Sequence, residues 1–95
     1  MDDSIQVNID LKIIYSINFD RNHFAISSKN GMVIYNLDTL KVIYSESGAF
    51  WDAIFIPNTD YILYVKHDYS EKSKRQLTIF DFGRKKIIST ITVKH

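Results

Sequence analysis

The sequence has no cysteine among its 95 residues, which excludes both a disulfide framework and a cysteine-based zinc site. Its only glycines are Gly31, Gly48 and Gly83, and they lie too far apart to form a glycine-rich phosphate loop. No serine stands in the Gly-x-Ser-x-Gly pattern of a nucleophile elbow. We therefore predict a protein that is not an enzyme and that holds no cofactor.

Candidate metal ligands and catalytic acids are also scarce. The three histidines, His23, His67 and His95, are far apart in the sequence, so no metal site is predicted. Several aspartates fall among turn residues, where the side chain commonly binds its own backbone. They are Asp20, Asp38, Asp60 and Asp68.

No stretch approaches the roughly 18–20 apolar residues of a membrane-spanning helix, and the acidic start MDDSIQVNID is not that of a signal peptide. The 12 Lys and Arg against 11 Asp and Glu leave a net charge of +1, which does not favour nucleic acid as a partner. The charge is divided unevenly, −2 over residues 1–47 and +3 over residues 48–95. These features predict a soluble, cytoplasmic protein.

Aromatic and β-branched residues are abundant, including six Tyr and six Phe, and they favour strands over helices. Turn residues divide them into short segments. The predicted strands are 4–9, 13–19, 23–28, 32–37, 41–45, 51–56, 61–67, 76–82 and 86–93. The order is one leading strand followed by two sets of four.

The two sets repeat one pattern. The stretch VIYNLDTLKVIYS returns later as TIFDFGRKKIIST. Ile34 aligns with Ile79 at an offset of 45 residues, whereas Ile17 aligns with Ile54 at an offset of 37. The eight-residue difference falls at HDYSEKSKR, which we interpret as a longer hairpin loop. The chain is therefore predicted to hold one structural unit twice.

A repeat of about 40–45 residues with four strands is typical of a β-propeller blade. Middle strands such as YILYV are apolar on both faces, as expected where blades stack face to face. We predict an all-β fragment (1–95) of an incomplete ring, with blade 1 at 10–47, blade 2 at 48–95 and a candidate ring-closing strand at 4–9. Two blades leave apolar faces open for self-association or for a protein partner. The alternative fold, a self-contained β-sandwich or barrel of eight or nine strands, would bury these strands without a partner.

This spacing resembles the WD-repeat propeller family over nearly all of residues 13–93. Where a WD blade ends its third strand with Trp-Asp, this chain has Tyr35-Asn36 and Phe80-Asp81. The sequence is most similar to the PROPPINs, the phosphoinositide-binding propellers. SINFDRNHFAISSKNGMVIYNLD is similar to their first blade, and LTIFDFGRKKIISTI is similar to their second.

The PROPPIN resemblance implies phosphoinositide binding in autophagy and membrane trafficking, and with it a cytoplasmic protein that can lie at the periphery of a membrane. PROPPINs bind lipid through a Phe/Leu-Arg-Arg-Gly motif in a later blade, and these 95 residues lack it, so the resemblance assigns no lipid-binding residue here. The function predicted first is a non-catalytic scaffold that associates with another chain or with itself through open blade faces. A PROPPIN-like lipid-binding protein and a self-contained β-sandwich binding protein are the alternatives.

Six residues are predicted to contact a partner, with core packing or solvated loop charge as their ordinary alternatives. Phe50 and Trp51 open a first strand, which lines the central channel of a propeller, so they can reach a rim; Trp is enriched at interface hot spots. Tyr69, in the inserted loop, is the aromatic residue that we most expect to be exposed. The basic residues of that loop can contact an acidic partner, an anionic membrane or nucleic acid. They are Lys72, Lys74 and Arg75.

Overall fold

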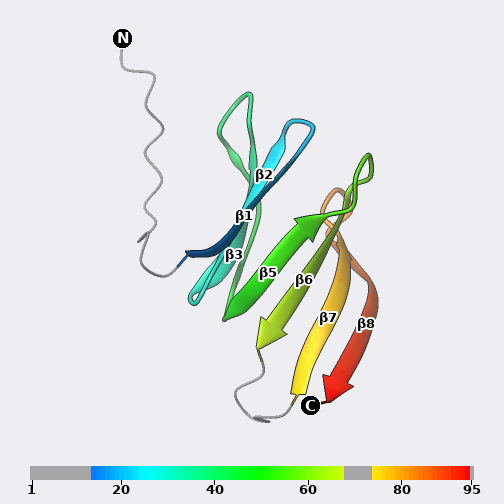
Figure 1. Ribbon diagram of the computed structural model, residues 1–95. Helices are drawn as coiled ribbons and strands as arrows, with labels where there is room; N and C mark the ends of the chain where they lie inside the picture. The colour runs from blue at the N-terminus through cyan, green and yellow to red at the C-terminus, as the bar shows by residue number, and fades with distance from the viewer. Residues whose placement is uncertain (1–13, 68–73, 95) are drawn as a thin grey trace.

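The computed structural model describes residues 14–67 and 74–94, which form two four-stranded antiparallel sheets (Figure 1). Blade 1 consists of β1 (Ile14–Asp20), β2 (His23–Ser28), β3 (Gly31–Asn36) and β4 (Val42–Ser47). Blade 2 consists of β5 (Phe50–Phe55), β6 (Tyr61–His67), β7 (Lys74–Asp81) and β8 (Lys86–Lys94). Within each blade the strands lie in chain order, so each sheet is a meander. This confirms the all-β prediction of two four-stranded blades and differs from a sandwich with Greek-key connections. The leading strand predicted at 4–9 lies outside the described residues.

The predicted strand limits agree with the structure to within two residues. Two limits differ by two residues: β4 ends at Ser47 rather than at residue 45, and β7 begins at Lys74 because His67 of β6 pairs with Arg75 and prolongs the hairpin. Lys74 and Arg75 therefore belong to a strand, and their predicted placement in the inserted loop is wrong. Strand pairing with β6 therefore outweighs the polar composition of this stretch.

The two blades use the same two turns. Among residues 14–67 and 74–94, four residues other than glycine have a left-handed backbone, with φ of 52° at Arg21, 61° at Leu40, 62° at Asn58 and 56° at Lys85. Arg21 and Asn58 lie 37 residues apart, each between the first and second strands of its blade. Leu40 and Lys85 lie 45 residues apart, each between the third and fourth strands. Because this conformation is uncommon outside glycine, its recurrence at the two offsets of the sequence repeat shows that the backbone repeats as well.

The third strand of each blade ends in a side chain that caps the following turn. The Asn36 carboxamide oxygen accepts hydrogen bonds from the N–H groups two and three positions later, at 2.8 and 3.1 Å. The Asp81 carboxylate does the same in blade 2, at 3.0 Å for both bonds. These positions align with the Asp of the WD repeat, and their chemistry is that of an Asx turn.

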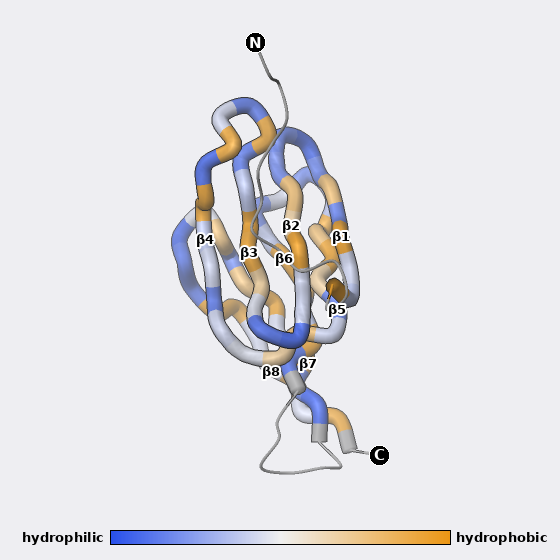
Figure 2. The backbone as a smooth tube through the Cα atoms, turned by 90° about the vertical axis from the view of Figure 1, so that its left-hand side faces the viewer, coloured by the Kyte–Doolittle hydropathy of each residue, from blue (hydrophilic) through white to orange (hydrophobic). Residues whose placement is uncertain are grey.

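The core lies between the two blades. The strand registers put Ala25, Ile34 and Tyr44 side by side on the face of blade 1 that meets blade 2. Hydrophilic residues gather in the turns at both ends of the strands, whereas hydrophobic residues are more frequent along the strands (Figure 2). The buried cluster contains Ala25, Met32, Ile34, Phe50, Ala53, Phe55, Ile62, Tyr64, Phe80 and Phe82.

The innermost strands of the two blades, β1 and β5, lie side by side (Figure 1). The backbone N–H of Phe55 donates to the Asn18 carboxamide oxygen at 2.8 Å, and that of Ala53 donates to the Ser16 hydroxyl at 3.2 Å. These side chains bind backbone groups that no neighbouring strand of blade 2 reaches, because β5 is an edge strand. They also fix how blade 1 meets the inner edge of blade 2.

A second polar link joins the outer strand of blade 1 to the second strand of blade 2. Glu46 of β4 accepts a hydrogen bond from the Tyr44 hydroxyl at 2.6 Å and forms an ion pair with Lys66 of β6 at 3.0 Å. Burial and the Glu46 carboxylate raise the pKa of Tyr44, and burial raises the pKa of Tyr64. Both tyrosines therefore stay neutral above the pH at which a solvated tyrosine ionises.

Candidate functional site

The outer face of blade 1, which points away from blade 2, is apolar. Its residues are Ile17 and Phe19 of β1, Phe24 and Ile26 of β2, Val33 and Tyr35 of β3, and Val42 of β4. The Phe24 ring lies 4.8 Å from the Tyr35 ring and 5.8 Å from the Phe19 ring, between centroids. Phe24 and Ile26 are buried at the centre of this face, whereas Ile17 and Phe19 are 50% and 63% exposed.

The outer face of blade 2 has the same character. It consists of Ile54 of β5, Leu63 and Val65 of β6, Leu77 and Ile79 of β7, and Ile91 and Val93 of β8. Ile54 and Ile91, at its two sides, are 52% and 57% exposed. The inner faces of the same two blades hold residues of the same kind at 0–4% exposure. The outer faces therefore have the apolar composition of a covered blade face, but large side chains at their sides remain exposed.

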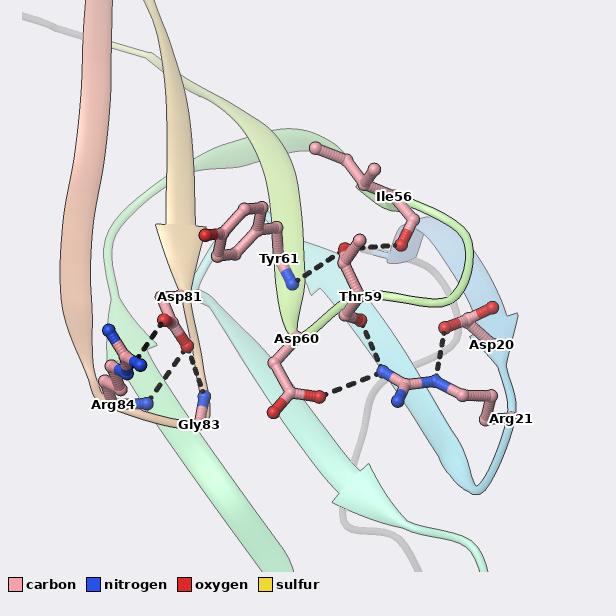
Figure 3. A network of polar contacts seen from close by, with 9 residues as sticks. All are labelled: Asp20, Arg21, Ile56, Thr59, Asp60, Tyr61, Asp81, Gly83 and Arg84. Atoms are coloured by element: carbon pink, nitrogen blue, oxygen red, sulfur yellow. Dashed lines mark hydrogen bonds and ion pairs between the residues drawn. The ribbon is translucent and has the colours of Figure 1, made fainter.

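A shallow cleft of about 450 Å³ lies at the rim where turns of the two blades meet. Arg21 is at its centre (Figure 3): the guanidinium donates at 3.0 Å to Asp20 and at 3.0 Å to Asp60, and it also binds the Thr59 carbonyl. These hydrogen bonds raise the pKa of Arg21. The remaining lining residues are Asn58, Tyr61, Asp81 and Arg84.

The charges of this cleft cancel. Two arginines, Arg21 and Arg84, face two aspartates, Asp60 and Asp81, and Arg84 lies 3.9 Å from the Asp81 carboxylate. An anion would have to displace the carboxylates that already bind the guanidinium. The arrangement ties the β1–β2 turn of blade 1 to the β5–β6 turn of blade 2, so we interpret it as a clamp between blades. Within residues 14–67 and 74–94 no group of His, Asp or Glu side chains could hold a metal ion.

The residues predicted to contact a partner do not form one surface. Phe50 is fully buried in the core, edge-on to Tyr64 at 5.1 Å between ring centroids, because it faces blade 1. Because it is fully buried, the Phe50 side chain is not accessible to a binding partner. Trp51, the next residue, is 40% exposed. The predictions for Tyr69 and Lys72 lie outside the described residues, and Lys74 begins β7.

Two of the predicted contacts meet at the inner edge of the blades. The Trp51 ring stacks on Tyr15 of β1 at 5.7 Å between centroids, and the Arg75 guanidinium lies 4.8 Å from the Trp51 ring centroid. Sequence reasoning had not included Tyr15. Tyr15 and Trp51 both occupy irregular positions, where the β1–β2 and β5–β6 pairings shift register, so strand alternation could not place them.

Comparison with known proteins places the fold. No family model and no curated protein matches the sequence. Hsv2 of Kluyveromyces marxianus superposes with a TM-score of 0.59 at 19% identity, over 85% of this chain and 26% of that chain. Two structures of Kluyveromyces lactis Hsv2 match over 86% of this chain and 25% of theirs, with TM-scores of 0.59 and 0.57 at 22% and 25% identity.

This chain has the fold of two neighbouring β-propeller blades. Hsv2 is a PROPPIN, so the resemblance noticed in the sequence extends to the backbone. The chain spans about a quarter of the length of the solved propellers that it matches. No helix among its described residues has the length and apolar character needed to cross a membrane.

Proposed function

We propose that this chain is a non-catalytic β-propeller module whose two outer faces stack on further propeller blades. The supporting observation is the exposure of large apolar side chains on both faces, above all Ile17, Ile54 and Ile91, each at least half exposed. Exposed apolar patches of this kind are interaction sites. Full burial of one such side chain stabilises by about 1.5–3 kcal/mol, so several on each face can offset the entropy lost on association.

A further blade is the partner that fits these faces. The contact between blades 1 and 2 already shows how two such sheets meet, with small residues such as Ala25 and Ala53 among larger ones. The matched Hsv2 structures are about four times as long as their matched part, which supports additional blades as neighbours. These come from a second copy or from a longer chain, and the size of the assembly separates the two sources.

Sedimentation of the 95-residue chain tests the proposal. We expect a species larger than the 11.1 kDa monomer, because an isolated pair of blades leaves both outer faces in water. Ile54→Glu and Ile91→Glu should shift the population toward monomer, whereas Thr39→Glu, in an exposed turn, should not. A wild-type monomer that unfolds cooperatively at every concentration would refute self-stacking. If that monomer also failed to bind a separately made propeller fragment with an open blade face, the proposed function would fall.

Phosphoinositide recognition is the second candidate. It is favoured by the fold shared with the PROPPIN Hsv2 and by the exposed basic turn Arg84, Lys85 and Lys86. Flotation with vesicles that contain or lack phosphoinositide tests it. The scaffold proposal expects equal flotation with both vesicles, since these residues lack the lipid motif implied by the resemblance. Phosphoinositide-dependent flotation that Arg84→Glu abolishes would favour lipid recognition.

A further inference from the structure

The outer edge of blade 2 is a long open strand. β8 spans nine residues, Lys86–Lys94, and pairs with β7 along its whole length. Among the described residues, β7 is the only strand hydrogen-bonded to it. Its other side therefore presents a row of backbone N–H and C=O groups, which is a template for an added strand.

The side chains of β8 do little to protect this edge. Between its terminal lysines runs IISTITV, which has no charge and no proline. Ile87, Ile88 and Ile91 are each about half exposed. Short polar or charged edge strands normally discourage pairing, and a β-branched, uncharged run of this length does the opposite.

The inner edge of the same blade shows the contrast. There the backbone N–H groups of Ala53 and Phe55 in β5 are bound by side chains from blade 1. The outer strand of blade 1, β4, has six residues and includes the charged Glu46. Of the edge strands β4, β5 and β8, the edge of β8 is thus the one that combines length, apolar side chains and exposure.

Charge indicates which strand fits. After Asp81 the sequence has no acidic residue, whereas Arg84, Lys85 and Lys86 stand at one end of β8 and Lys94 ends it. Pairing of two β8 strands would bring these like charges together, which is unfavourable. The complementary partner is an apolar strand with acidic residues at both ends.

The chain itself contains such a segment. DDSIQVNID, residues 2–10, has nine residues like β8, alternates Ile5, Val7 and Ile9 with polar residues, and has aspartates at both ends. In either strand direction its acidic ends meet the basic ends of β8. We propose that residues 4–9 of a second copy add to the outer edge of β8 as a fifth strand. The edge is a separate surface from the outer faces, so this proposal does not rest on the proposed function.

The added strand must come from a second copy, because residues 4–9 are tethered too closely to β1 to reach the outer edge of β8 in their own chain. A strand added outside β8 lies four strand spacings from β5, or about 19 Å, and β1 lies beyond β5 on the side of blade 1. The link from residue 9 to Ile14 covers at most about 18 Å when fully extended. The segment therefore falls short of β8 in its own chain, whereas a neighbouring copy has no such limit.

Disulfide trapping tests the pairing directly, because the chain has no cysteine of its own. Gln6→Cys and Thr90→Cys place one thiol at the centre of each nine-residue segment, and the centres meet in either strand direction. A mixture of the two singly substituted chains, oxidised mildly, is expected to give a mixed dimer by mass spectrometry. Its yield should be several-fold that obtained when Ser45→Cys, on the edge of blade 1, replaces Thr90→Cys. Equal yields from the two edges would overturn the proposal.

Two further variants separate this pairing from other contacts. Lys86→Glu together with Lys94→Glu should lower the mixed-dimer yield, and Asp3→Lys with Asp10→Lys in the other chain should restore it. Failure of that rescue would rule out the charge-matched pairing. Ile54→Glu, on the outer face, should leave the yield unchanged. If it abolished the yield, the dimer would be a face-to-face stack, which contradicts the edge proposal and agrees with the proposed function.

Discussion

Blade 1 and blade 2 repeat one backbone but end in different outer strands. β4 is six residues long, and its Glu46 is held by Tyr44 and by Lys66 of the other blade. β8 is nine residues long, and its side chains from Lys86 to Val93 are exposed. The hairpin turns define the blade, while the outer strand is free to diverge. The comparison shows that the length and composition of the outer strand determine how much of a blade is accessible to a partner.

The largest expected effect concerns what the blades share. Ile34→Ala in blade 1 and Ile62→Ala in blade 2 each remove a fully buried side chain from the common core, and each should lower the free energy of unfolding by about 2–5 kcal/mol. Urea unfolding measures the loss. Ile87→Ala, at a half-exposed site, is the control and should change it by about 0.5 kcal/mol or less. Separate unfolding transitions for the two blades would contradict a shared core.

A smaller difference is expected at the caps of the third strands. Asp81→Ala should cost about 1.5–3 kcal/mol and Asn36→Ala about 1 kcal/mol, because hydrogen bonds to a buried charged acceptor are the stronger ones. Asp81→Asn keeps both acceptor bonds to the turn but loses the charge, so it should recover about 1 kcal/mol, the contribution expected of the neutral Asn36 cap. Thermal or urea unfolding of the three variants checks the order. An equal or larger loss at Asn36 would show that charge does not distinguish the two turns.

The smallest effect is a pH dependence. The folded-state pKa values of Tyr44 and Tyr64 lie above the ordinary value of 10.0, so the unfolded chain releases these protons first as pH rises. Their contribution to stability is complete below about pH 10 and is lost progressively above it. Tyr44→Phe in blade 1 and Tyr64→Phe in blade 2 should each flatten the alkaline decline of the unfolding free energy. An unchanged slope in both variants would argue against buried neutral tyrosines.

The strands could be predicted because turn-forming residues mark where they end. Residues such as Asn30-Gly31 and Asp38 stop an apolar run wherever they occur, and a four-strand repeat of this period is typical of a propeller blade. The inserted loop was predicted too long, because the pairing of His67 with Arg75 depends on the partner strand and not on local composition.

The side-chain contacts were harder to predict. Phe50 and Trp51 are neighbours that both look suited to a rim, yet one is fully buried and the other is 40% exposed. Their difference arises at the register shift between Phe50 and Asp52, which no single sequence reveals. The bonds from Ser16 and Asn18 to β5 likewise depend on how two blades meet, so they need the assembled structure.

The four left-handed turn positions have a consequence for finding relatives of this chain. Arg21 in blade 1 corresponds to Asn58 in blade 2, and Leu40 corresponds to Lys85. The same left-handed backbone conformation is therefore adopted by different amino acids at equivalent positions. Family models and curated sequences give no match to this chain, whereas superposition of backbones does. Further blades of this kind are best sought by the sequence separation of equivalent turns, which is 37 residues for the first turn and 45 residues for the second.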